Sequence, residues 1–253
     1  MDIKEVDTFF RSILNIEEMK SIDRSLNGLQ VSSRTGEITK IAFAVDASLE
    51  SFKRAAQHGA DMIFVHHGLF WGTEKPVTGD YFRRLSFLIE KNIALYAVHL
   101  PLDMDPVLGN NITAAKKSGL EELQPFGEYH GKKIGYKGVF PEGKTCEEVI
   151  SAFGFKSSDI LSVLKFGPEK NNSAGVITGG ACREVEQAID ERLDLYITGE
   201  ISHQIYHQCL EAGINVISAG HYLTEIFGIK NVEKTVREKL PLDTCFIDIP
   251  TGL

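Results

Sequence analysis

The two halves of this chain repeat one pattern, and the repeat is the feature that most restricts the folds open to it. An apolar run at residues 60–67 recurs at residues 193–200, each with aspartate in second place. The offset is constant, because 194 minus 61 and 200 minus 67 both give 133. Self-similarity of this kind indicates two related structural units rather than one continuous sheet.

A second correspondence follows the first in each half. Its offset is 122, since 221 minus 99 gives that value, and it aligns His99 with His221 and Asp103 with Glu225. Both halves therefore carry a His-x-x-x-carboxylate sequence directly after an apolar run. The smaller offset indicates that the second half is slightly shorter than the first.

Helical and strand periodicities alternate along the chain, which is typical of the α/β class. Helices are expected at residues 5–20, 49–58, 80–91, 110–118, 146–153, 183–192, 201–212 and 225–239. Strands are expected at residues 27–31, 41–45, 61–66, 93–98, 133–140, 160–166, 174–178, 195–198, 214–219 and 244–249. We predict two related α/β units with mainly parallel or mixed sheets flanked by helices, at residues 1–125 and 126–253. The last strand could pack back on the first unit.

Composition narrows the function. The chain has 253 residues, 43% of them hydrophobic, and a net charge of -8, which argues against binding to a nucleic-acid backbone. No apolar run reaches membrane-spanning length, and the N-terminal residues lack a signal-peptide pattern. The four cysteines have no Cys-x-x-Cys spacing, as expected of thiols in a reducing compartment. We expect a cytoplasmic protein that does not bind membranes.

Imidazole and carboxylate side chains follow three of the expected strands, at the ends where ligands gather in open α/β sheets. They are His66, His67, His99, Asp103, His221 and Glu225. Nitrogen and oxygen donors without thiolate suit zinc, manganese, iron or nickel. The sequence therefore predicts a metal site, and the adjacent pair His66 and His67 favours two ions, because neighbours in a strand point to opposite faces.

Structural explanations of the same residues stay open. His66 and His67 could be a hydrogen-bonded pair at a strand end, Asp103 could be a turn residue, and Glu225 could stabilise a helix start. In a metal site, Asp103 or Glu225 could bridge the ions. His99 could be a ligand, a residue that orients a ligand, or a substrate contact, and we favour the last two.

Other residues are candidates for proton transfer and substrate binding. Glu200 holds the position in the second half that His67 holds in the first, and it could act as a general base or acid, as could His99. His203 is expected near the site. Gly179 and Gly180 are expected to open a helix, where their amides could bind a phosphate.

The chain resembles a known family at five motifs. They are Asn27–Val31, Val65–Gly68 with Trp71, His99–Asp103, Thr198–Glu200 with His203, and Gly220–Glu225. On these residues it is similar to the GTP cyclohydrolase I type 2 homologs, also called Nif-three-like dinuclear-metal proteins. The stretch Leu100–Leu102 departs from the family, in which polar residues are common there.

The resemblance implies a short family member, without the domain that longer relatives insert between residues 120 and 145. It implies two divalent ions per subunit, with His66, His67, Asp103, His221 and Glu225 as ligands. It also implies a toroidal homohexamer, built as a trimer of dimers.

Two hypotheses about function follow. One is a metal-dependent hydrolase for a small molecule, possible substrates including a nucleotide; the resemblance points to hydrolytic opening of the GTP imidazole ring. The alternative is a non-catalytic, metal-binding hexamer that acts in regulation through protein partners.

Overall fold

A computed structural model describes residues 1–253, apart from the side chain of Ser157. The described chain divides into two compact units. Unit 1 combines residues 1–102 with 228–249, and unit 2 combines residues 103–227 with 250–253. These units are discontinuous in sequence, whereas the division expected at residues 125 and 126 is continuous. The division into α/β units at residues 1–125 and 126–253 stays a prediction.

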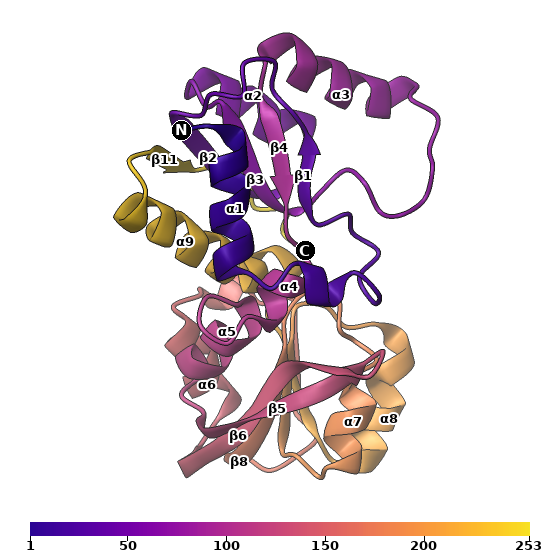
Figure 1. The fold of residues 1–253 in the computed structure, drawn as a ribbon. Helices are drawn as coiled ribbons and strands as arrows, with labels where there is room; N and C mark the ends of the chain where they lie inside the picture. The colour runs from indigo at the N-terminus through magenta and orange to yellow at the C-terminus, as the bar shows by residue number, and fades with distance from the viewer. The chain divides into compact units, whose positions relative to one another are not determined.

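Unit 1 contains a sheet whose strands lie in the order β1-β4-β3-β2-β11 (Figure 1). The strands are β1 (Gly28–Val31), β2 (Lys40–Asp46), β3 (Met62–His67), β4 (Ala94–Ala97) and β11 (Asp243–Phe246). Neighbouring strands are parallel except β1, which is antiparallel to β4. The helices of this unit include α1 (Ile3–Ile13), α2 (Leu49–Gln57) and α3 (Gly79–Lys91).

The expected first helix is correct at its start and wrong at its end. Asp2 accepts a hydrogen bond from the N–H of Lys4 and forms a capping box with Glu5, so α1 begins at Ile3, two residues early. It ends at Ile13 instead of residue 20 because Leu14 is extended. Leu14 and Ile16 are both buried, and a separate short 3-10 helix, Glu17–Met19, follows them within the expected range.

Unit 2 contains a mixed sheet whose strands lie in the order β5-β6-β8-β9-β10-β7. The strands are β5 (Glu121–Tyr129), β6 (Lys132–Lys144), β7 (Ser162–Leu164), β8 (Asn171–Ile177), β9 (Leu195–Thr198) and β10 (Asn215–Ser218). The helices wholly within this unit include α5 (Asn110–Ser118), α6 (Cys146–Phe153), α7 (Val185–Asp190) and α8 (Tyr206–Ala212). Two further helices, α4 (Leu100–Met104) and α9 (His221–Lys239), contain residues of both units.

The strand expected at residues 133–140 is confirmed within β6, whereas its hairpin partner β5 was not expected. The turn residues His130 and Gly131 have φ angles of 48° and 81°, the positive values that a tight hairpin turn requires. Most of β5 is exposed at the edge of the sheet, so its sequence lacks the apolar residues of a buried strand.

The topology of the two sheets confirms two related α/β units. In unit 1, β2, β3 and β4 are parallel and β1 is antiparallel to β4; in unit 2, β8, β9 and β10 are parallel and β7 is antiparallel to β10. Asp61 accepts hydrogen bonds from the N–H groups of Thr39 and Lys40. Asp194 does the same for Asn172 and Ser173, and 172 minus 39 again gives 133.

The second correspondence is one residue away from its expected register. The N–H of Ala94 donates to the carbonyl of Asp61, and the N–H of Asn215 donates to that of Asp194. Since 215 minus 94 gives 121 rather than 122, the residue of the second half that corresponds to His99 is Gly220, not His221.

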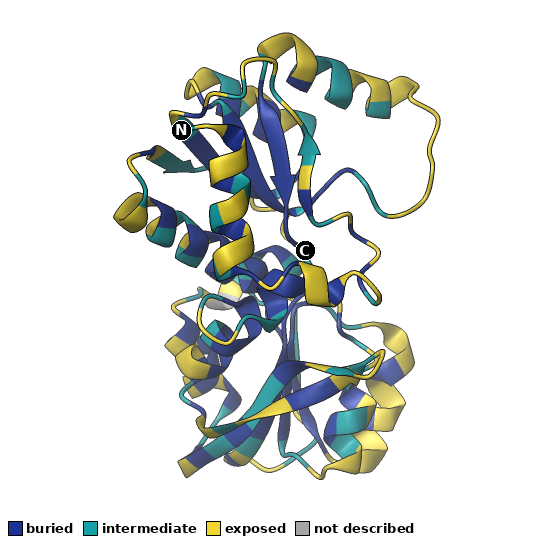
Figure 2. Cartoon of the chain, viewed as in Figure 1, coloured by how far each residue is buried: buried dark blue, intermediate teal, exposed yellow. Residues whose placement is uncertain are grey.

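Each sheet has buried side chains on both faces. In unit 1, Phe10 of α1 packs on Phe64 and Tyr96 of the sheet, and Phe52 and Leu88 belong to a separate buried cluster with α2 and α3. Strands β3 and β4 are buried over nearly all of their length (Figure 2). In unit 2, one cluster involves α5 and α6 and another involves α7 and α8. Ligand sites can form at the carboxyl ends of the parallel strands. None of the helices in the described residues has the length and apolar content needed to cross a bilayer.

Candidate metal centre

Three histidines of unit 1 lie together at the carboxyl ends of β3 and β4. His66 and His67 end β3, and His99 follows β4. The ring centroids are 4.7 Å apart for His66 and His67, 5.0 Å for His66 and His99, and 5.7 Å for His67 and His99. One nitrogen from each ring can be chosen so that all three lie within 4.8 Å of one another. The adjacent pair therefore contributes to one cluster despite its position in a strand.

Each of these rings has an oxygen acceptor beside its Nδ1 atom. The acceptors are the carbonyl of Val98 for His66 at 2.9 Å, Asp46 for His67 at 2.8 Å and Asp23 for His99 at 2.9 Å. Because these oxygens only accept in this setting, each Nδ1 donates, and Nε2 is the atom that offers its lone pair to an ion. Metal-binding histidines are commonly oriented in this way. The residues present thus fit a divalent metal.

Asp23 was missed in the sequence, although it holds His99. Its side chain is 1% exposed and accepts hydrogen bonds from Asn27 Nδ2 and from the N–H groups of Ser25 and Leu100, besides the one from His99. Burial opposes its ionisation, but the bonds from His99, Asn27 and Ser25 outweigh burial and lower the pKa of Asp23. Its only local signal is the Asp-x-Ser spacing of an Asx turn.

Trp71 flanks the histidine cluster. Its ring meets that of His99 edge to face, with centroids 5.0 Å apart, and lies 6.1 Å from that of His67. The indole N–H donates to the carbonyl of Gly68 at 3.0 Å, which fixes the ring. As the single tryptophan of the chain, Trp71 reports on this cluster in fluorescence.

A second group of polar side chains lies in unit 2, at the start of α9. This helix begins at His221, four residues before its expected start, so His221 and Glu225 share one face. His221 Nε2 is 3.1 Å from Glu225 Oε1, and His221 Nδ1 is 2.5 Å from Glu200 Oε1. Burial lowers the pKa of His221, but Glu225 and Glu200 outweigh burial and raise it to about 9.

Gly179 is required by the packing of Glu225. Its φ is +68°, and a Cβ atom there would lie 2.2 Å from Glu225 Oε1. The N–H of Gly179 donates to Thr224 Oγ1. Gly179 and Gly180 do not open a helix, because α7 begins only at Val185. Their substrate contacts stay a prediction.

Asp103 lies on α4 rather than in the turn that the sequence suggested. It is buried, with 7% of its surface exposed, and it accepts a hydrogen bond of 2.8 Å from Asn110 Nδ2. Asn110 is itself fully buried at the start of α5. A buried carboxylate held from one side in this way can be oriented toward an ion.

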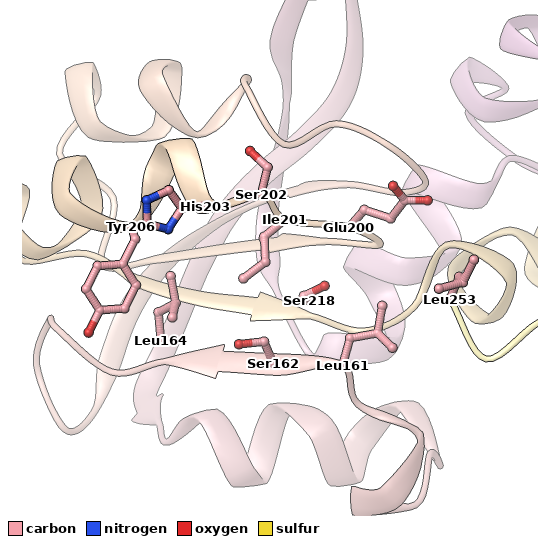
Figure 3. A pocket seen from close by; sticks show the side chains of 10 residues that line it. All are labelled: Leu161, Ser162, Leu164, Glu200, Ile201, Ser202, His203, Tyr206, Ser218 and Leu253. Carbon is pink, nitrogen blue, oxygen red and sulfur yellow. The ribbon is translucent and has the colours of Figure 1, made fainter.

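Glu200 and His203 follow β9 and both line a cavity of about 530 Å³ in unit 2 (Figure 3). His203 begins a short 3-10 helix, His203–Ile205, and α8 follows only at Tyr206, so the helix expected from residue 201 starts late. His203 is exposed, and the Glu200 side chain is about half exposed at 47%.

The whole chain is similar to known proteins. A match to the family described as Duf34/NIF3 (NGG1p interacting factor 3) covers residues 1–251. The chain belongs to this family. Among Duf34/NIF3 relatives, the GTP cyclohydrolase 1 type 2 homolog of Archaeoglobus fulgidus is 42% identical, and that of Treponema pallidum is 38% identical. Both alignments cover 100% of each chain, and they confirm the resemblance inferred from the motifs.

Solved structures show the same two-unit α/β fold. Protein ybgI, described as of unknown function, is 33% identical with a TM-score of 0.90 over 100% of both chains. Reduced HcgD from Methanocaldococcus jannaschii is 28% identical with a TM-score of 0.85 over 98% of both chains. These comparisons establish family and fold, and the roles of individual residues stay predictions.

Proposed function

We propose that the protein is a hydrolase that depends on two divalent metal ions, with His66, His67, Asp103, His221 and Glu225 as ligands. The observation that carries the proposal is the cluster of His66, His67 and His99, in which every Nδ1 is held by an oxygen acceptor. This donor set suits zinc, iron, manganese or nickel.

The side chains around the proposed ligands can move protons. His66, His67, Asp103, His221 and Glu225 would hold the ions, which would supply Lewis acidity and activate water near neutral pH when bound. Glu200 accepts a hydrogen bond from His221 Nδ1 and is half exposed, so it can also accept a proton from a neighbouring reactant. His99 is held by Asp23 and can serve as a second proton carrier.

The proposed substrate is a nucleotide, and the proposed reaction is ring-opening hydrolysis. Support comes from the relatives, which carry the name GTP cyclohydrolase 1 type 2 homolog. His203, Gly179 and Gly180 are the proposed substrate contacts.

We further propose that the protein forms a homohexamer. We also propose that it is located in the reducing cytoplasm, which is supported by four cysteines that are all thiols in the described chain.

Elemental analysis and a nucleotide panel test the proposal together. Purified protein should contain divalent metal, and metal-loaded protein should turn over at least one nucleotide. Asp103→Ala and Glu225→Ala should abolish this turnover. Glu238→Ala is a matched control, because Glu238 is an exposed residue of the same helix as Glu225.

Tightly bound metal without turnover of any nucleotide would contradict the hydrolase and favour the non-catalytic regulatory hexamer. Light scattering during size-exclusion chromatography measures the oligomer separately, and a monomer would contradict the hexamer alone.

A further inference from the structure

The cavity that contains Glu200 lies where ligands bind in parallel sheets. Glu200 and His203 follow β9, and Ser218 ends β10, so the cavity is at the carboxyl ends of these parallel strands. Ser162 of β7 lies opposite Ser218 in the strand pairing and lines the same cavity. A volume of about 530 Å³ is within the usual range for small-molecule sites.

Glu200 makes one end of the cavity an acceptor of hydrogen bonds. One of its oxygens is engaged by His221 Nδ1, but a carboxylate offers about four lone-pair directions, so N–H groups of a bound molecule can still be accepted. The residues that line the described cavity include no lysine or arginine. The cavity is thus suited to a neutral or cationic group and opposes phosphate.

The rest of the cavity wall is largely apolar. Leu161 and Tyr206 are 43% and 41% exposed, and Leu164 and Ile201 lie between Tyr206 and Glu200 in Figure 3. The Tyr206 ring meets Phe166 edge to face at 5.1 Å, which holds it in place. Large apolar side chains that line a cavity favour the flat face of a ring compound.

The polar groups are separated along the cavity. Figure 3 shows Glu200 toward one end and Tyr206 with His203 toward the other. A ligand that satisfies both ends has N–H donors on one edge and hydroxyl groups some distance away, joined by an apolar plane. A nucleoside has this arrangement, whereas a nucleoside triphosphate adds charge that the cavity does not neutralise.

We propose that this cavity binds an uncharged nitrogen heterocycle of nucleoside size, with its N–H edge on Glu200 and its hydroxyl groups toward His203 and Tyr206. The assignment of this compound class as substrate rests on the proposed function, whereas binding of the heterocycle to the cavity requires no metal. Any phosphate of the same substrate lies outside this cavity.

Isothermal titration calorimetry of the full chain, before and after EDTA treatment, tests the proposal. The probes are guanosine, with two adjacent N–H donor groups; adenosine, with an amino group alone; and GTP. Guanosine should bind with a Kd on the order of 1 mM or tighter, and more tightly than adenosine and GTP. Glu200→Gln, which preserves shape, should weaken guanosine binding about tenfold, because a hydrogen bond to a charged group is lost.

Leu161→Trp should fill the cavity and abolish guanosine binding. Leu210→Trp is its control, because Leu210 is similarly exposed at 47% and does not line the cavity. Absence of guanosine binding, tighter binding of GTP, or guanosine binding unchanged by Glu200→Gln would each overturn the proposal. Quenching of Trp71 fluorescence by Ni²⁺ in the wild-type protein, whose single tryptophan it is, measures the metal site, so either proposal can fail while the other stands.

Discussion

Replacement of Asp23 by asparagine tests whether the Asp23 carboxylate holds His99 in place. The change keeps the shape of the side chain but removes a buried negative charge that accepts four hydrogen bonds, from His99, Asn27, Ser25 and Leu100. A hydrogen bond to a charged group contributes about 1.5–3 kcal/mol. We expect Asp23→Asn to lower the free energy of unfolding by about that amount at pH 7, as measured by urea denaturation.

Metal affinity should fall together with stability. Asp23 holds His99, whose ring lies 5.0 Å from that of the proposed ligand His66, and loss of such a supporting group typically weakens metal binding about 10–100-fold. Titration with Ni²⁺, followed by Trp71 fluorescence, measures this affinity because Trp71 lies beside His99. Asp80→Asn is the control, since Asp80 is 71% exposed and its ion pair with Arg83 contributes at most about 1 kcal/mol.

The stability that Asp23→Asn removes should depend on pH in a definite direction. The pKa of Asp23 is lower in the folded protein, so its stabilisation is present above the unfolded value of about 3.9 and is lost as pH falls through the folded value. The difference in stability between wild type and variant should therefore be full at pH 7 and shrink in acid below about pH 4. Equal stability and equal metal affinity at pH 7 would refute the role assigned to Asp23.

Three further outcomes are expected. In EDTA-treated protein, Glu200→Gln should lower the pKa of His221 from about 9 toward its usual value, as measured by NMR titration. The stabilisation that the contact of Glu200 with His221 provides is present below about pH 6.5, and it is lost as the pH rises through the folded pKa of His221. An unchanged titration would contradict the contact. Gly179→Ala should destabilise the protein by at least about 1–2 kcal/mol in urea denaturation, because the φ of Gly179 is positive and the new Cβ would meet Glu225. Gly180→Ala is the control and should be nearly neutral, because a Cβ at Gly180 would have its nearest neighbouring atom at 3.6 Å. Glu225→Ala should lose metal by elemental analysis while circular dichroism and oligomeric state stay those of wild type, and full metal occupancy would exclude Glu225 as a ligand.

Regular periodicity and capping predicted much of the fold. The helix Asn110–Ser118 and the strand Leu195–Thr198 have the expected bounds, because an apolar pattern and a clear end signal coincide in each. Strand β5 could not be predicted in this way, since an exposed edge strand needs few apolar residues. The predicted end of α1 was wrong because Leu14 and Ile16 are apolar and buried, and so they continue the apolar pattern of the helix although the helix has already ended.

The candidate site was predictable only in part. His66 and His67 follow an apolar strand, and this position alone marks them as candidates. Asp23 could not be found, because its importance comes from a contact with His99, 76 residues away in sequence. The contact of Glu200 with His221 was likewise invisible, although the repeat had singled out both residues.

The matched ends of β3 and β9 show how gene duplication can diversify a scaffold. At the offset of 133, Asp46 corresponds to Gly179 and His67 to Glu200. The first copy has an acid beside a base, whereas the second has a glycine, with no side chain, beside an acid. Two copies within one polypeptide can evolve separately, so that nitrogen-rich and oxygen-rich surroundings are inherited together.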